Sequence, residues 1–142
     1  MITWIRKTGR GEVEKVMGAY YDWCRLGAGS AGLAIMSGAF GAHGLKARKL
    51  DPALLKAWET AAHYHLIHSV ALVAASATNR LTDSTGAMFA GGMLLFSGSL
   101  YMMVLTGQKM PWGPITPIGG LTLVGAWLSL ASSSPAAGKG GE

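Results

Sequence analysis

The sequence predicts an all-α, polytopic membrane protein, with four transmembrane helices preceded by a short N-terminal amphipathic helix. Of its 142 residues, 50% are hydrophobic and 13% are charged, which is fewer ions than a soluble domain of this size uses to cover its surface. Four apolar stretches each approach the roughly 20 residues that span the hydrocarbon core of a bilayer. The 21 glycines are also typical of membrane helices, whose backbones approach closely at small residues.

Composition and motifs also exclude several functions. The formal net charge is +5, but the basic residues flank apolar stretches and form no stripe with interleaved aromatics, so no nucleic-acid partner is expected. The single Cys24 excludes an intramolecular disulfide and a zinc site built from several cysteines. No glycine-rich phosphate loop follows a strand pattern, and no serine or cysteine nucleophile has a recognisable motif. We therefore expect no enzyme activity, no resident cofactor and no metal site.

Residues 1–25 form an N-terminal extension. Within it the apolar positions Val16, Met17, Tyr20 and Cys24 follow helical spacing. The neighbouring aromatic residues suit the headgroup level of a membrane, so the pattern predicts an amphipathic helix that lies at the interface. An elongated start to the first spanning helix fits the same pattern, and the sequence leaves both arrangements open.

The four-helix transmembrane domain is expected over residues 26–131. Its first helix, residues 26–43, carries no ionisable group except His43 at its end. Small residues at three- and four-residue spacing form a predicted packing face on this helix, and two glycines do so on the last helix. The predicted packing residues are Gly32, Gly38, Gly41, Gly119 and Gly120.

A polar connection, residues 45–57, leads into the second helix. Asp51 is placed as an N-cap and Pro52 as the first helical residue, and the apolar stretch that follows runs over residues 58–78. Basic residues in this connection are predicted to contact lipid headgroups, with cardiolipin as the candidate anionic lipid. These residues are Lys46, Arg48 and Lys49.

The third helix is expected over residues 86–106, which carry no charge, and the fourth over residues 115–131. Pro117 falls in the first turns of the fourth helix, where its missing N–H costs least. The tail, residues 132–142, is polar and of low complexity. Because it has no apolar surface to bury, it is expected to be flexible.

Four segments of the chain resemble the transmembrane-protein-256-like family, also catalogued as a bacterial domain of unknown function. They read GAFGAHGLK, WETAAHYHLIHSVAL, LLFSGSLYMMVLTG and PIGGLTLVGAWLSLA. The resemblance covers residues 26–131 and implies a four-helix inner-membrane protein of bacteria and mitochondria. It implies no catalytic site, because the family has no assigned activity. The extension and the tail depart from the compact bacterial pattern, which suggests contacts with neighbouring subunits.

All four histidines lie between positions 43 and 68 together with Glu59, and this clustering is the sharpest candidate for chemistry. The predicted polar cluster consists of His43, Glu59, His63 and His65. His68 lies deeper along the second helix, where an ionisable group inside a membrane is a functional hypothesis by default. The functional interpretations are haem ligation by His68, a metal site formed by Glu59 and His63 with His43, and proton or quinone handling.

A structural interpretation of the same residues is favoured. In it Glu59 and His63 bond to each other at the interface, His43 caps the end of the first helix, and His68 bonds a hydroxyl or carbonyl group across helices. The side chains that could serve as partners are Ser37, Tyr64, Ser69, Ser97 and Tyr101.

The preferred function is a non-catalytic accessory subunit of a membrane assembly, in particular a respiratory-chain complex of the mitochondrial inner membrane. Its expected partners are other membrane subunits and phospholipid. One alternative is a small redox or transport protein built around His68 and Glu59. Another is a stand-alone lipid-binding or membrane-organising protein of a bacterial inner membrane.

Overall fold

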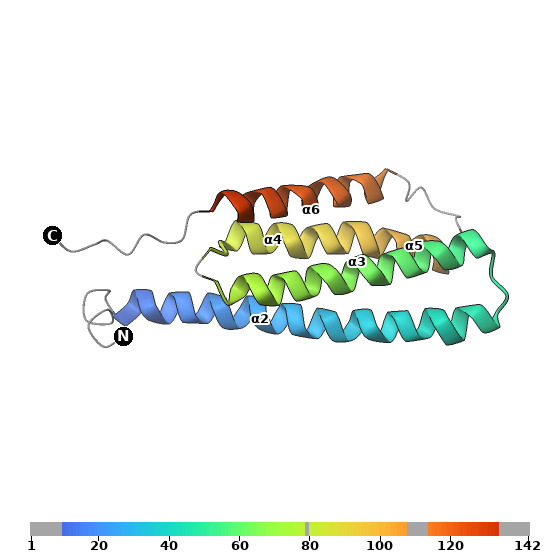
Figure 1. Ribbon diagram of the computed structural model, residues 1–142, viewed down its shortest axis with the longest axis horizontal. Helices are drawn as coiled ribbons and strands as arrows, with labels where there is room; N and C mark the ends of the chain where they lie inside the picture. Colours follow the sequence, from blue (N-terminus) through green and yellow to red (C-terminus); the bar gives the residue numbers. More distant parts are fainter. Residues whose placement is uncertain (1–9, 79, 108–113, 134–142) are drawn as a thin grey trace.

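The computed structural model describes residues 10–78, 80–107 and 114–133, and this part of the chain is all-helical (Figure 1). Two short segments have π-helical hydrogen bonding and continue the helices that precede them. In chain order the elements are α2 (Arg10–Ala39), η1 (Phe40–Leu45), α3 (Pro52–Ser76), α4 (Asp83–Met93), η2 (Leu94–Gly98), α5 (Ser99–Leu105) and α6 (Ile115–Ser132). The prediction of an all-α protein is confirmed for these residues.

The long helices lie side by side, in the order α2, α3, the continuous α4–η2–α5 helix, and α6 (Figure 1). Helix α2 packs along α3, and α6 packs on α4 and η2. One apolar cluster fills the end of the bundle where α3 ends, and it consists of Leu72, Phe89, Met93, Leu123 and Ala126. A second cluster of Leu45, Trp58 and Val104 fills the opposite end.

Two helices are long and apolar enough to cross a membrane, namely residues Asp83–Leu105 and Ile115–Ser132. The other two long helices are less apolar, for reasons visible in the sequence. Helix α2 is rich in glycine and alanine, and α3 carries Lys56, Glu59 and three histidines. Length and composition of the described helices thus support two of the four expected spans.

Helix α2 is continuous through the expected boundary at residues 25 and 26. Residues 10–25 of the extension and the first predicted spanning helix therefore form one continuous helix, which is one of the two arrangements that the sequence leaves open. No proline interrupts this stretch, so nothing breaks the helical hydrogen bonding. The N-terminal turns of α2 project beyond the other helices (Figure 1). Residues 1–9 and most of the predicted tail, residues 134–142, lie outside the described part.

The remaining helix ends follow local signals. Asp51 caps α3 as predicted, because its carboxylate accepts a hydrogen bond of 2.7 Å from the backbone N–H of Ala53. The third predicted helix begins at Asp83, three residues earlier than expected, because the Thr82 hydroxyl accepts a hydrogen bond from the N–H of Thr85. Helix α6 begins at Ile115 as predicted.

Close helix approach depends on glycine at two of the five predicted packing positions. A β-carbon on Gly41 would overlap the indole ring of Trp58, and one on Gly119 would overlap the backbone of Phe96 in η2. A β-carbon on Gly120 would lie 3.5 Å from the Phe96 ring, and one on Gly38 would lie 4.0 Å from Ala62, which are ordinary contacts. Gly32 is exposed, with nothing within 4 Å of such an atom.

Large apolar side chains point outward from every long helix. Leu33 and Met36 on α2 are 58% and 66% exposed, and Leu121 on α6 is 73% exposed. The others with more than half of their area exposed include Ile35, Val70, Leu94, Leu105 and Leu128. An apolar surface on all sides of a bundle is suited to lipid and not to water.

The contact at Gly119 yields a test of helix packing. We expect Gly119→Ala to lower the free energy of unfolding by about 1–3 kcal/mol, because the added methyl group forces α6 away from the η2 backbone. The matched variant Gly120→Ala should be neutral or slightly stabilising, since its methyl group finds ordinary contact and alanine favours helix. Unfolding in detergent micelles with increasing dodecyl sulfate measures both changes. Equal effects of the two substitutions would contradict this account.

Candidate functional site

A chain of polar side chains crosses the interior of the bundle from α2 to α5. The Ser30 hydroxyl on α2 lies 2.8 Å from His65 Nε2 on α3, and the His65 Nδ1 atom lies 3.4 Å from the Tyr101 hydroxyl on α5. Ser69, one turn beyond His65, lies 2.9 Å from Ser30 and 2.7 Å from the backbone carbonyl of His65. We call Ser30, His65, Ser69 and Tyr101 the interhelical polar network.

The number of donor protons and acceptor atoms limits how the hydrogen bonds of this network can be directed. The Ser69 hydroxyl has one proton, and the His65 carbonyl can only accept, so donation to that carbonyl leaves Ser69 an acceptor toward Ser30. The Ser30 hydroxyl can then donate either to Ser69 Oγ, in which case it accepts from a protonated His65 Nε2, or to His65 Nε2, in which case the proton of a neutral imidazole lies on Nδ1. The arrangement links three helices and holds no carboxylate or thiol.

His68 is buried, as its predicted depth implies, with 6% of its surface exposed. Among the described residues it makes no hydrogen bond across helices, which corrects the structural interpretation of this residue. Its Nδ1 atom lies 2.7 Å from the carbonyl oxygen of Tyr64, one turn earlier on the same helix, so Nδ1 carries the proton. The imidazole packs against the rings of Tyr64, Phe89 and Trp127, with centroids 5.8, 6.3 and 6.2 Å away. A haem would have to displace these rings, and the haem and quinone interpretations stay predictions.

The other members of the predicted polar cluster do not converge. Glu59 is exposed and pairs with Lys56 at 3.8 Å, so it does not bond His63, which is also exposed. His43 is exposed in η1, and only His65 of the cluster joins the interhelical polar network. The reason is rotation, because successive residues point about 100° apart around a helix. Within the described ranges no three His, Cys, Asp or Glu side chains lie close enough to hold a metal ion.

The basic connection between η1 and α3 is exposed at one end of the bundle. Lys46, Arg48 and Lys49 are all exposed, and the Arg48 guanidinium lies 5.8 Å from the centre of the Phe40 ring. Lys49 has a left-handed backbone conformation, with φ of 53°, which turns the chain toward Asp51. Their contact with lipid headgroups stays a prediction.

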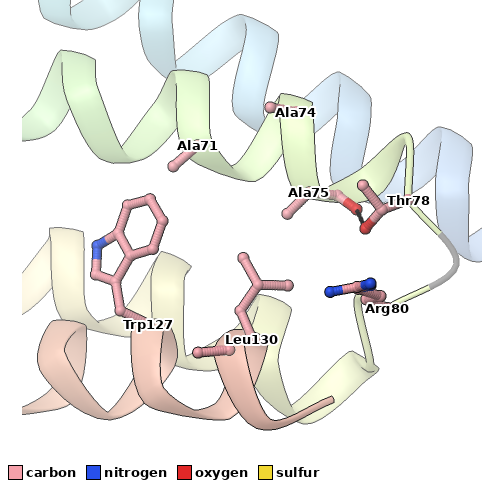
Figure 2. A pocket seen from close by; sticks show the side chains of 8 residues that line it. Ala71, Ala74, Ala75, Thr78, Arg80, Trp127 and Leu130 are labelled. Atoms are coloured by element: carbon pink, nitrogen blue, oxygen red, sulfur yellow. Dashed lines mark hydrogen bonds between the residues drawn. The ribbon is translucent and has the colours of Figure 1, made fainter. Parts of the chain in front are cut away.

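A groove that sequence reasoning missed lies between α3 and α6 (Figure 2). It has a volume of about 640 Å³. Helix α6 packs mainly on α4, and α3, which packs mainly on α2, also contacts α4, so α4 lies between α3 and α6 and keeps them apart. Helix α3 contributes Ala71, Ala74 and Ala75 to the walls, Thr78 follows its C-terminal end, and α6 contributes Trp127, Leu130 and Ala131. Arg80 lies at the end of the groove, in the connection to α4 (Figure 2).

Sequence patterns named the residue types of the network but not their pairing. Ser69 and Tyr101 were among the predicted partners, whereas Ser30 was not, and no local signal favours it over Ser37, the other serine of α2. Ser97, another predicted partner, is buried, and its hydroxyl makes no hydrogen bond with the described residues. Threonine–serine pairs that join α6 to its neighbours were also missed, namely Thr85 with Ser129 at 2.7 Å and Ser99 with Thr116 at 2.6 Å.

The network predicts a measurable coupling between Ser30 and His65. In a double-mutant cycle with Ser30→Ala and His65→Ala, we expect a coupling of about 0.6–1.7 kcal/mol in the free energy of unfolding, the range for hydrogen bonds between membrane helices. The control cycle pairs Ser30→Ala with His63→Ala, whose side chain is exposed and should show no coupling. Coupling of equal size in both cycles would contradict a specific hydrogen bond between Ser30 and His65.

Comparisons with known proteins show which family the sequence of this chain matches. A family model described as "Protein of unknown function (DUF423)" matches residues 37–120. The chain is 41% identical over 109 residues to a UPF0382 membrane protein of Staphylococcus aureus, and the alignment covers 74% of this chain and 88% of the relative. It is 39% identical over 111 residues to the UPF0382 membrane protein YwdK of Bacillus subtilis, covering 74% and 89%.

A relative also occurs in a eukaryote. A UPF0382 membrane protein of Schizosaccharomyces pombe is 39% identical over 104 residues, and the alignment covers 69% of this chain and 88% of that protein. No solved structure is significantly similar to the chain. The family match includes His65, His68 and Tyr101, but Ser30 and the α6 wall of the groove lie outside it.

Proposed function

The chain belongs to the DUF423 family, and we propose that it is a stand-alone integral membrane protein, with four crossings and a lipid-binding or membrane-organising role. That it is a membrane protein follows from its relatives, which are named as membrane proteins. The observation that carries the stand-alone proposal is the internal pairing of the bundle. Side-chain hydrogen bonds join α2 to α3, α4 to α6 and α5 to α6 without a second chain.

The length of the relatives supports the same proposal. The alignments cover 88% and 89% of two bacterial relatives, so the part of this chain that they match corresponds to almost all of each relative. We include in the proposal that the protein is not an enzyme, because the sequence has no recognisable nucleophile motif and no three His, Cys, Asp or Glu side chains gather among the described residues. Placement in the narrower transmembrane-protein-256-like family is also proposed, on the motif GAFGAHG at residues 38–44.

Four crossings are proposed on the length and outer surface of α2 and α3. The 25 residues of α3 extend about 37 Å at the helical rise, more than the roughly 30 Å of the hydrocarbon core. Val70 on α3 and Leu33 on α2 are more than half exposed, as expected for side chains that face lipid. Helix α3 also lies alongside α4–η2–α5, which is itself long enough to cross, and α2 lies alongside α3.

The proposed compartment is based on the organisms of the relatives. Staphylococcus aureus and Bacillus subtilis supply bacterial relatives, and we therefore propose a bacterial membrane in place of the mitochondrial inner membrane. The fission-yeast relative makes an organelle membrane the alternative compartment.

Cysteine labelling tests the number of crossings. In a Cys24→Ser background, we expect Arg48→Cys and Ala77→Cys to react with a membrane-impermeant maleimide from opposite sides, because α3 lies between them. If only α4–η2–α5 and α6 cross, both positions will be labelled from the same side. The control Ser133→Cys lies at the same end of the bundle as Ala77 and should be labelled from the Ala77 side in either arrangement.

The accessory-subunit interpretation is the second candidate, and one observation favours it. The outer face of α2 carries Gly29 and Gly32, and a β-carbon added to either residue would meet nothing of the described chain within 4 Å. A helix of another subunit could approach closely there. A respiratory-chain complex of the mitochondrial inner membrane would be the assembly under this candidate.

Native gels after mild solubilisation separate the two candidates. The stand-alone proposal predicts migration as a monomer or small homo-oligomer, for the natural chain and for Gly32→Leu alike. An accessory subunit would instead migrate with a larger assembly, and Gly32→Leu would release it because the leucine side chain blocks close approach. Gly38→Leu is unsuitable as a control, since that residue faces Ala62; Gly18→Leu, on the projecting turns, is the matched variant.

A further inference from the structure

The groove between α3 and α6 has the chemistry of an amphiphile-binding site. Its α3 wall is made of alanines, and its α6 wall of Trp127 and Leu130, so the body of an occupant must be apolar. The Thr78 hydroxyl is already used, because it donates to the carbonyl of Ala75 at 2.7 Å (Figure 2). The volume of about 640 Å³ lies within the roughly 300–1,000 Å³ of small-molecule sites.

One end of the groove carries a positive charge. The Arg80 side chain lies beside Thr78 and Leu130, where the groove reaches the end of the bundle (Figure 2). Among the described residues the single ion pair joins Lys56 to Glu59, so no described carboxylate neutralises Arg80. Asp83, the nearest acidic residue along the chain, accepts a hydrogen bond from the Trp23 indole at 3.1 Å. A planar guanidinium pairs well with phosphate oxygens.

The direction of the groove matches the direction of a lipid molecule. Ala71 lies five residues before Ser76, the last residue of α3, which places it about 7 Å from that end, toward the middle of the helix. The charged end thus lies where α3 ends and the apolar end lies deeper in the bundle. In a protein that spans the bilayer, the charged end would lie at the level of the lipid headgroups and the apolar end at the level of the acyl chains.

We propose that the α3–α6 groove binds one acyl chain of an anionic glycerophospholipid, whose phosphate group pairs with Arg80. This inference rests on the proposed membrane function and adds to it a defined site and a lipid class. The apolar walls select the acyl chain, and the Arg80 charge selects a headgroup with net negative charge. A helix from a second copy would also cover apolar walls, but it would leave the Arg80 charge without a partner.

Native mass spectrometry of the full chain in detergent tests the proposal. The delipidated protein is titrated with phosphatidylglycerol or with phosphatidylcholine of the same chain length. We expect phosphatidylglycerol to bind about fivefold more tightly, the factor that one interfacial arginine supplies. Arg80→Gln should remove this preference and leave binding of phosphatidylcholine unchanged. Arg25→Gln, an equal loss of charge on α2 at the same end, should preserve the preference.

Blocking the groove tests the acyl-chain site separately. Ala71→Phe, and independently Ala74→Phe, should weaken binding of both lipids at least tenfold, while Ala77→Phe on the same helix, outside the groove, should bind as the natural chain does. Unchanged lipid binding in both blocked variants, or a preference that survives Arg80→Gln, would overturn the proposal. A blocked variant that no longer dimerises but still binds lipid would also overturn the proposal. Cysteine labelling of the crossings is independent, so the lipid site can fail while the proposed membrane function stands.

Discussion

Close approach of helix backbones inside an apolar environment is the constraint on which this bundle depends. Lipid is as apolar as leucine, so membrane helices associate through close contact and hydrogen bonds, with little contribution from hydrophobic burial. Gly119 meets that constraint where α6 contacts η2, and Gly41 meets it beneath Trp58. Serine and threonine pairs then form at short distance between the same helices, as between Thr85 and Ser129. Large apolar side chains are left for the outer surface.

The central helix α3 shows how one element serves two faces. His65 and Ser69, spaced by four residues, point toward α2 and α5 and close the interior with hydrogen bonds. Ala71 and Ala75, also spaced by four, line the groove toward α6. Small side chains on the second face keep the groove open because α4 already holds α3 and α6 apart. Substitutions on the face of α3 that pairs with α2 and α5 can therefore occur independently of substitutions on the face that lines the groove.

Helix positions could be predicted from local sequence, because the signals that start and stop helices are local. The Asp51–Pro52 pair marks the start of α3, and the uncharged stretch before Gly107 marks α5. The polar network could not be predicted in the same way. Choosing His65 over His68 requires the rotation of α3 relative to α2 and α5, which depends on packing between distant segments. The groove likewise exists only because α4 separates two helices that are far apart in sequence.

The π-helical segment η2 has a consequence for how this family tolerates insertions and deletions. Met93 and Tyr101 flank it, and both reach α3, through Ser69 and His65 respectively. Eight residues of regular α-helix would leave Tyr101 about 80° around the axis from Met93, whereas π-type bonding absorbs an additional residue and restores the alignment. A homologous chain with one residue fewer between these positions would need no π-type bonding, because seven residues of regular α-helix turn through about 700°, close to two full turns, and its tyrosine would still point toward the histidine.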